Sequence, residues 1–322
     1  MKRAAYSRFG TPKQVLVVEE VKRPEPGPGQ VLVRMVLSPV HNHDLMTIAG
    51  QYGFKPQLPA GAGTEAVGVV EALGEGVTHL QVGQRVAGGA QETWAEFYLA
   101  DARRVIPVPD SVDDATACQL VSMPLSAKML LDTLGVEAGQ WIALNAANGA
   151  VGKLMAKYGA ALGIKVLGLV RRAEAVQELA DIGFDTVVAT QGDGWQDKVR
   201  SITGGEPIVR GIESLGGEGA AQLLSILSDG AELISFGAMT GRPLKISAAD
   251  LLFRGITVKG FWGSNPPVKP ERIGVLLGEL IADAAAGRLK MEIEASYPIA
   301  EVATAVAASD EPGRKGKIAI RG

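Results

Sequence analysis

The chain has 322 residues, a length typical of two or three domains, and its formal net charge is −3. Apolar residues make up 47% and charged residues 21% of it, which excludes a disordered chain and a coiled coil. No basic field is present, so we expect no nucleic-acid or membrane partner. The single cysteine, Cys118, excludes a disulfide framework and any zinc site that needs two thiolates.

The N-terminal residues Met1–Tyr6 lack the apolar core of a secretory signal, and no run of about eighteen apolar residues occurs. We therefore expect a cytoplasmic protein without a membrane span. Glycine is abundant, with 41 residues, whereas aromatic residues make up only 5%. This composition is typical of α/β sheets with many tight turns.

The first hundred residues alternate apolar and polar side chains in short runs bounded by glycine and proline. Strands are predicted at 14–20, 30–37, 66–70, 84–87 and 94–99. This pattern predicts a small, partly closed antiparallel barrel. A helix capped by Asp110 or Ser111 is expected to follow, through residues 115–120.

After Gly139 apolar strands alternate regularly with helices. Strands are predicted at 141–145, 165–170, 186–189, 209–214, 231–236 and 256–261, and helices at 151–162, 173–182, 195–202 and 219–227. Several strands are apolar at nearly every position, as parallel strands covered on both faces are. The pattern predicts an α/β fold with a Rossmann doubly wound parallel sheet. Helices at 270–287 and 299–309 and strands at 292–297 and 316–320 are expected to close the chain.

Residues 141–153 place a strand, a turn of small residues and a helix in succession. Ala147, Gly149 and Gly152 occupy the spacing of a G-x-G-x-x-G motif. Small residues let the backbone approach a pyrophosphate, which the free N–H groups and the dipole of the helix attract. We expect a nucleotide site here, although a purely structural turn is the alternative. The residues expected to contribute are Asn145, Ala147, Asn148, Gly149, Ala150, Val151 and Gly152.

The end of the next strand indicates which dinucleotide is bound. A carboxylate about twenty residues after the glycines would bind the ribose 2′-hydroxyl of NADH, but Arg171 and Arg172 stand there. Two guanidinium groups suit a 2′-phosphate, so NADPH is the predicted cofactor, and a solvated arginine pair is the alternative. Three later turns are expected to line the ligand crevice, at Ser214–Gly217, Phe236-Gly237-Ala238 and Phe261-Trp262-Gly263.

Over essentially its whole length the chain resembles the medium-chain dehydrogenase/reductase superfamily. The closest resemblance is to the zinc-independent 2-enoyl thioester reductases, of the mitochondrial trans-2-enoyl-CoA reductase type, with quinone oxidoreductases next. The segments that carry it are Val40–Leu45, Gly50–Gly53, Gly63–Glu65, Ala146–Gly152 and Gly260–Trp262. The resemblance implies a GroES-like catalytic domain, residues 1–117 and 266–322, and a Rossmann cofactor domain, residues 118–265.

The resemblance also implies site residues. Tyr52, in a Gly-x-Tyr segment, would donate a hydrogen bond to the substrate oxygen, since a phenol stays protonated at neutral pH. Trp262 would line the substrate pocket or the nicotinamide cleft, and a core or interface tryptophan is the alternative. His41 stands where this group usually has asparagine, so it is interpreted as a neutral polar residue that lines the cleft. From its place before the last strand, Lys317 is expected to face the cofactor phosphates, with a solvated lysine as the alternative.

No metal is expected. Thr64 stands where the zinc-dependent members have the histidine of a Gly-His-Glu signature, and His41 and His43 have no evident third ligand. Asp44 and Glu65 are interpreted as structural.

Without a metal, the reaction expected is hydride transfer from NADPH to the β-carbon of an activated C=C bond, most simply that of a trans-2-enoyl thioester. One alternative is a quinone or general enone reductase, and another is an NADPH-binding regulator without catalysis. The strand at 256–262 would be an exposed sheet edge in a monomer, so we expect a homodimer.

Overall fold

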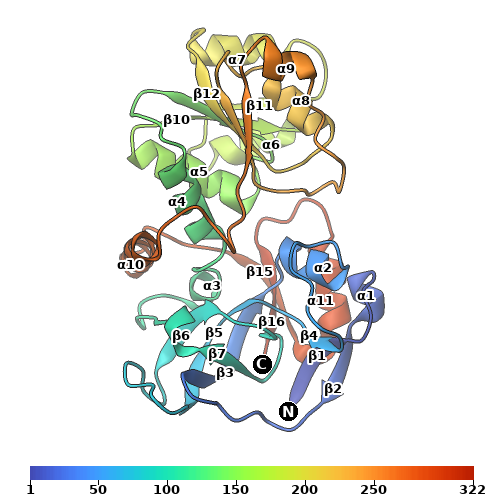
Figure 1. The fold of residues 1–322 in the computed structure, drawn as a ribbon, viewed down its shortest axis with the longest axis vertical. Coiled ribbons are helices and arrows are strands. Elements are labelled where there is room, and N and C mark those ends of the chain that lie inside the picture. The colour runs from blue at the N-terminus through green and yellow to red at the C-terminus, as the bar shows by residue number, and fades with distance from the viewer. The chain divides into compact units, whose positions relative to one another are not determined.

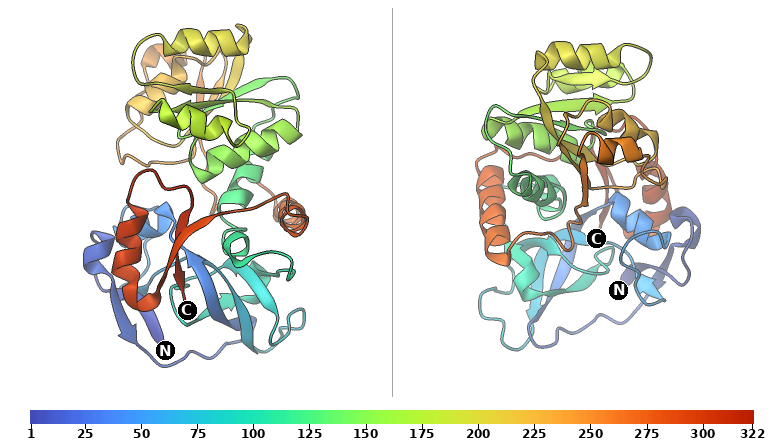
Figure 2. Two further views of the ribbon diagram at one scale, coloured as in Figure 1. Left: turned by 180° about the vertical axis from the view of Figure 1, so that it is seen from behind. Right: turned by 45° about the horizontal axis from the view of Figure 1, so that its top comes forward.

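A computed structural model describes residues 1–322, and the chain forms two compact units (Figure 1). Unit 1 comprises Met1–Ser122 and Leu277–Gly322, and unit 2 comprises Met123–Leu276. Both chain ends therefore belong to unit 1 (Figure 2). No helix of the chain combines the length and the apolar character that a membrane span needs.

Unit 2 is built on one parallel sheet of six strands in the order β11-β10-β9-β12-β13-β14. The strands are β9 (Trp141–Leu144), β10 (Lys165–Val170), β11 (Val187–Ala189), β12 (Ile208–Glu213), β13 (Glu232–Ser235) and β14 (Thr257–Gly260). In chain order this is 3-2-1-4-5-6, the order of a doubly wound dinucleotide-binding sheet. The predicted α/β class and Rossmann sheet are confirmed.

The helices of unit 2 cover both faces of this sheet (Figure 1). They are α4 (Met123–Thr133), α5 (Ala150–Ala161), α6 (Glu174–Ala180), α7 (Trp195–Thr203), α8 (Glu218–Leu224) and α9 (Ala248–Leu252), and the unit boundary falls within α10 (Pro270–Ala285). Buried side chains of the strands and of α7 and α8, such as Leu167, Val199 and Leu223, form the core. Such burial is the main favourable contribution to folding.

Unit 1 contains a seven-stranded sheet and a three-stranded sheet. The larger has the order β15-β16-β3-β5-β6-β8, with β7 also paired to β3, and the smaller has the order β2-β1-β4. The strands are β1 (Lys2–Tyr6), β2 (Val17–Glu20), β3 (Gln30–Pro39), β4 (Ala60–Gly61), β5 (Glu65–Leu73), β6 (Arg85–Gly89), β7 (Phe97–Asp101), β8 (Val105–Pro107), β15 (Ile293–Pro298) and β16 (Lys317–Arg321). All pairs are antiparallel except β15 with β16, so the expected β-rich, GroES-like architecture is confirmed.

Short helices complete unit 1 around a core that includes Trp94, Tyr6 and Tyr98. They are α1 (Pro12–Val15), α2 (Asn42–Ile48), α3 (Asp114–Ala117) and α11 (Val302–Ser309), with 3-10 turns η1 (Ala102–Arg104) and η2 (Ile299–Glu301). Two local expectations were wrong. The strand predicted from residue 14 begins at Val17, because Pro12 opens a helical turn before it. The residue that caps α3 is Asp113, and not Asp110 or Ser111 as predicted, because the Asp113 side chain accepts the Thr116 N–H.

Candidate active site

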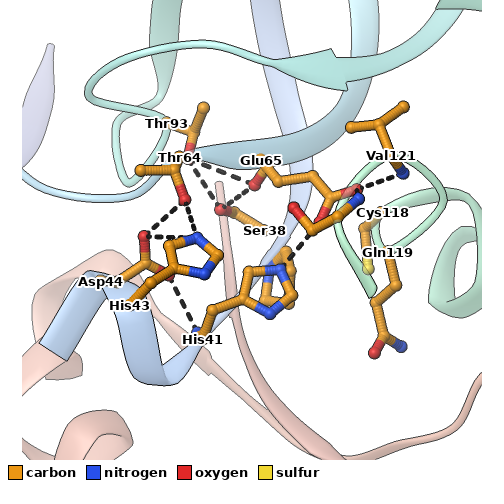
Figure 3. A network of polar contacts seen from close by, with 12 residues as sticks. Ser38, His41, His43, Asp44, Thr64, Glu65, Thr93, Cys118, Gln119 and Val121 are labelled. Carbon is orange, nitrogen blue, oxygen red and sulfur yellow. Dashed lines mark hydrogen bonds and ion pairs between the residues drawn. The ribbon is translucent and has the colours of Figure 1, made fainter. Parts of the chain in front are cut away.

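Unit 1 contains a buried cluster of polar side chains at the junction of β3, α2 and β5 (Figure 3). Ser38, His41, Asp44, Glu65 and Thr93 have essentially no exposed surface. The Ser38 hydroxyl donates to the Glu65 carbonyl at 2.6 Å and lies 3.0 Å from the Thr93 hydroxyl. Buried polar groups are stable only when they are hydrogen-bonded, so these contacts hold the three segments together.

The centre of this cluster is a pair formed by His41 and Glu65. Nε2 of His41 lies 2.8 Å from Oε2 of Glu65, and neither side chain is exposed. The other oxygen, Oε1, accepts the backbone N–H groups of Val121 and Ser122 at 2.6 and 3.1 Å. Nδ1 of His41 is buried and has no partner. His41 therefore lies beneath the surface, bonded to Glu65, and a pocket-lining role for it is not part of our proposal.

Burial shifts both groups toward their neutral forms. It raises the pKa of Glu65 to about 7, although hydrogen bonds from Ser122 and Val121 act in the opposite direction. It also lowers the pKa of His41 well below its ordinary value, and the positive charge of Lys317 adds to this effect. His41 is therefore neutral at physiological pH, and one hydrogen is shared between its Nε2 and Glu65.

A second chain of hydrogen bonds starts at the neighbouring imidazole, His43. Nε2 of His43 lies 2.7 Å from the Thr64 hydroxyl, which donates to Oδ1 of Asp44 at 2.6 Å (Figure 3). Asp44 also accepts the N–H of His41 at 2.9 Å, as the capping carboxylate of α2. The Asp44 side chain thus holds His41 directly and His43 through Thr64.

Tyr52 and Lys317 lie at the margin of the cluster. The Tyr52 ring is half-buried just after α2, with its centroid 5.8 Å from that of His43. Lys317 opens β16, and burial lowers its pKa, while the carboxylates of Asp44 and Glu65 partly offset that effect. Lys317 makes no ion pair within 4 Å, and its electrostatic interactions include those with Asp44 and Glu65.

In unit 2 the predicted nucleotide turn lies at the carboxyl end of β9. Ala146 has a left-handed φ of 51°, and α5 starts at Ala150 with Gly149 as its N-cap and no side chain capping it. A Cβ on Gly152 would lie 2.5 Å from the Ala147 carbonyl oxygen, so only glycine allows this close packing. The N–H groups of Ala150, Val151 and Gly152 at the start of α5 donate to no backbone carbonyl, as an anion-binding helix start requires.

A buried carboxylate organises the adjacent turn. Glu213, at the end of β12, has no exposed surface. Its Oε1 accepts Nδ2 of Asn145 at 3.0 Å and the N–H groups of Leu215 and Gly216 at 2.8 and 2.7 Å. Oδ1 of Asn145 in turn accepts the Ser214 N–H at 2.8 Å. Asn145, expected to contact the cofactor, is thus 4% exposed and ties the nucleotide turn to the 214–216 turn.

Arg171 and Arg172 follow β10 at the same sheet edge as the nucleotide turn, because neighbouring parallel strands end together. Neither side chain makes a hydrogen bond or an ion pair within the chain. Two unpaired guanidinium groups beside free backbone amides fit a phosphorylated dinucleotide.

The remaining predicted cofactor residues follow β13 and β14. The rings of Phe236 and Phe261 lie 6.0 Å apart, and Trp262 is 41% exposed. Gly237 packs on Ser214, where a Cβ would lie 2.8 Å from the carbonyl oxygen, and Ala238 beyond it is exposed. These residues share the carboxyl edge of the sheet with Asn145 and Arg171.

The sequence analysis missed two features. Glu213 and the Thr64–His43 contact were not assigned roles, although a carboxylate at the end of an otherwise apolar strand was a signal for the first.

No group of three or more His, Cys, Asp or Glu side chains in the chain could hold a metal ion.

Family comparisons agree with both units. Residues 27–110 match the family model of the alcohol dehydrogenase GroES-like domain, and residues 150–277 match that of zinc-binding dehydrogenases. The human mitochondrial enoyl-[acyl-carrier-protein] reductase is 28% identical over 317 residues, which cover 95% of this chain and 85% of the relative. The Dictyostelium discoideum mitochondrial enoyl-[acyl-carrier-protein] reductase is 30% identical over 240 residues, 72% of this chain and 69% of the relative.

A solved structure shares the fold closely. A Bacillus thuringiensis protein provisionally named an NADPH:quinone reductase superposes with a TM-score of 0.92 at 28% identity. The match covers 100% of this chain and 98% of the other.

Proposed function

Because the chain belongs to the medium-chain dehydrogenase/reductase superfamily, in the zinc-independent group of enoyl reductases and quinone oxidoreductases, we propose that it is an NADPH-dependent oxidoreductase that reduces a C=C bond conjugated to a carbonyl. The preferred substrate class is a trans-2-enoyl thioester. The observation that carries the proposal is the carboxyl edge of the parallel sheet, where free amides of α5 lie with two unpaired arginines.

The cofactor is assigned to unit 2, within the Rossmann region 118–265. The amides at the start of α5 would bind its pyrophosphate, and Arg171 and Arg172 would bind its 2′-phosphate. Glu213 holds both turns in the shape that leaves these groups free. Phe236, Phe261 and Trp262 supply apolar surface at the same edge.

The chemistry is assigned to unit 1, which overlaps most of the catalytic region 1–117 and 266–322 that the resemblance implies. Bound NADPH supplies a hydride for the β-carbon of the substrate. Tyr52 donates its phenolic hydrogen to the carbonyl oxygen, on which negative charge develops as the double bond is lost. Lys317 contributes a positive charge that favours anionic cofactor or thioester groups. The nicotinamide and the alkene need only be held in orientation, which by itself provides a large part of the rate.

A second candidate function is quinone reduction. The same hydride chemistry serves a quinone, whose oxygen would also accept a hydrogen bond from Tyr52. The likeness to the Bacillus thuringiensis protein over the whole chain favours this candidate. A protein that binds NADPH without catalysis is the alternative from another functional class.

We also propose a homodimer formed through β14. This strand is the last of the sheet and its residues are mostly exposed. Three large apolar side chains before it are exposed as well, namely Leu251 at 45%, Leu252 at 73% and Phe253 at 83%. Pairing two edges would remove this aggregation hazard. Light scattering should give twice the chain mass, and a monomer at micromolar concentration would exclude the dimer.

Initial rates test the proposed function. Oxidation of NADPH and of NADH is followed with crotonyl-CoA and with 1,2-naphthoquinone at matched concentrations. We expect faster turnover with crotonyl-CoA and with NADPH. Turnover of the quinone alone would reject the thioester assignment, and tight NADPH binding without oxidation by any enone would favour the non-catalytic alternative.

A further inference from the structure

The imidazole of His43 has a position that the proposed mechanism does not use. It comes from the first turn of α2, contacts the Thr64 hydroxyl at 2.7 Å, and lies next to the ring of Tyr52. Its side chain is 21% exposed, whereas that of His41, stacked on it at 4.8 Å between centroids, is fully buried. Of the two histidines, His43 alone can reach a molecule bound beside Tyr52.

The hydrogen bonds determine which ring nitrogen is free. A threonine hydroxyl has one hydrogen, and at 2.6 Å that hydrogen is donated to Oδ1 of Asp44. Thr64 must therefore accept from His43, so Nε2 of His43 carries a hydrogen (Figure 3). Nδ1 of His43 makes no hydrogen bond and is not among the buried unpartnered atoms. The relay thus leaves Nδ1 open for proton transfer at the side of the ring that reaches solvent.

A buried carboxylate lies beside the ring of His43. Asp44 is 1% exposed, and the only basic side chain within 4 Å of its carboxylate is His43, with Nε2 at 3.8 Å from Oδ1. Burial lowers the pKa of the neighbouring His41 well below its ordinary value, so His41 is not the proton donor. Glu65 and Lys317 on the neighbouring strands also interact electrostatically with this cluster, and the ring of Tyr52 lies 5.8 Å from that of His43.

We propose that His43 is the acid that protonates the α-carbon of the substrate, with Thr64 and Asp44 as the relay that fixes its tautomer and stabilises its charge. This inference rests on the proposed function. The hydride pair from NADPH forms the C–H bond at the β-carbon, and the former π pair becomes an enolate. The enolate takes the proton from Nδ1 of His43, which becomes neutral, and water restores that proton. The net change is addition of H⁻ and H⁺ to the alkene and conversion of NADPH to NADP⁺.

The relay can be tested without substrate. The chain has only three histidines, so nitrogen NMR of ring-labelled protein resolves each imidazole, with His79 as an internal reference. We expect neutral His43 to carry its hydrogen on Nε2 in the wild type. Thr64→Val should shift it toward a mixture of tautomers, and Thr64→Ser should restore the wild-type signal. A wild-type His43 with its hydrogen on Nδ1 would overturn the relay.

Proton delivery is tested by reducing crotonyl-CoA in D2O and determining the configuration of the α-deuterium with a stereospecific acyl-CoA dehydrogenase. The wild type should give one configuration. His43→Gln should lower kcat at least tenfold and give a mixture, because water then protonates both faces. Thr64→Val should lower kcat less, and Thr64→Ser should recover it. His79→Gln, which replaces a histidine bonded to the Ala102 carbonyl, is the matched control and should leave both readouts unchanged.

The outcomes separate this inference from the proposed function. A His43→Gln variant that retains the single configuration overturns the inference, whatever its kcat. A wild type that oxidises no NADPH with crotonyl-CoA instead refutes the thioester function, and the proton-donor role with it. The tautomer measurement still reports in that case whether the Asp44–Thr64–His43 relay exists.

Discussion

Each unit contains one glutamate with no exposed surface, and the two glutamates use their oxygens differently. Oε1 of Glu65 accepts two backbone N–H groups in unit 1, and Oε1 of Glu213 accepts two in unit 2 together with the Asn145 amide. The second oxygen of Glu65 is bonded to His41, whereas that of Glu213 has no partner. In unit 2 the buried carboxyl group of Glu213 therefore shapes the turns at the carboxyl edge of the sheet. In unit 1 the buried carboxyl group of Glu65 supports the two imidazoles beside Tyr52.

The largest loss of stability is expected when the buried Glu213 side chain of unit 2 is replaced. Glu213→Leu leaves three donors without an acceptor, which should lower the free energy of unfolding by about 3–5 kcal/mol. Glu213→Gln keeps an acceptor oxygen at Oε1 but buries an amide donor where no acceptor stands, so it should cost about 1–3 kcal/mol, less than the leucine variant. Urea unfolding measures both. Equal losses in the two variants would show that the charge of Glu213, and not its acceptor geometry, stabilises the turn.

In unit 1, replacing Tyr52 should affect the chemical step and not cofactor binding. Tyr52→Phe should lower kcat by about ten- to a thousand-fold, which corresponds to about 1–4 kcal/mol of lost stabilisation at the substrate oxygen. NADPH affinity, measured by fluorescence titration, should stay unchanged. An unaltered kcat would remove Tyr52 from the mechanism.

In unit 2 the opposite result is expected from the arginine pair. Arg171→Ala should weaken NADPH binding by about ten- to a hundred-fold, since a charge-assisted hydrogen bond contributes about 1.5–3 kcal/mol. NADH, which has no 2′-phosphate, should bind nearly as before. Titration of the variant with both nucleotides makes the comparison, and equal losses would refute the phosphate assignment.

The smallest effect concerns the pH dependence of stability. The pKa of Glu65 is raised to about 7 on folding, so its contribution is lost as pH rises toward 7. The pKa of His41 is lowered, so its contribution is lost as pH falls below the ordinary value of the imidazole. The two slopes oppose each other between about pH 5 and 6.5, and the pair should contribute little net pH dependence there.

Replacing Glu65 or His41 alone should reveal how the other residue makes the free energy of unfolding depend on pH. Glu65→Gln leaves the His41 slope, so stability should rise by up to about 2 kcal/mol from pH 5 to 6.5. His41→Asn leaves the Glu65 slope, so stability should fall as pH rises toward 7. Urea midpoints over this range measure both, and parallel profiles in the two variants would contradict the opposed shifts.

The regular parts of the fold were predictable because they follow local rules. The strand Lys165–Val170 was predicted to the residue, since an apolar run bounded by turn residues identifies a parallel strand. The nucleotide turn was predicted from the spacing of Ala147, Gly149 and Gly152, which depends only on backbone geometry. By contrast, α9 has no buried residue and no apolar periodicity, so the sequence contained little signal for it.

Contacts between distant segments were not predictable. His41 and Glu65 are 24 residues apart, and Asn145 and Glu213 are 68 apart, so only the folded sheets bring them together. Burial then determines their chemistry, because a carboxylate or an imidazole looks the same in a sequence whether it is exposed or enclosed. Tyr52 was identified by resemblance, and its role stays a prediction.

The central claim is that a phenol, and not a divalent ion, stabilises the substrate oxygen. The most direct test is the kcat for crotonyl-CoA reduction before and after prolonged dialysis against a strong chelator, with metal content measured on the same samples. We expect an unchanged kcat and far less than one metal ion per chain. Stoichiometric zinc in the active protein, with turnover lost on chelation and restored by zinc, would contradict it.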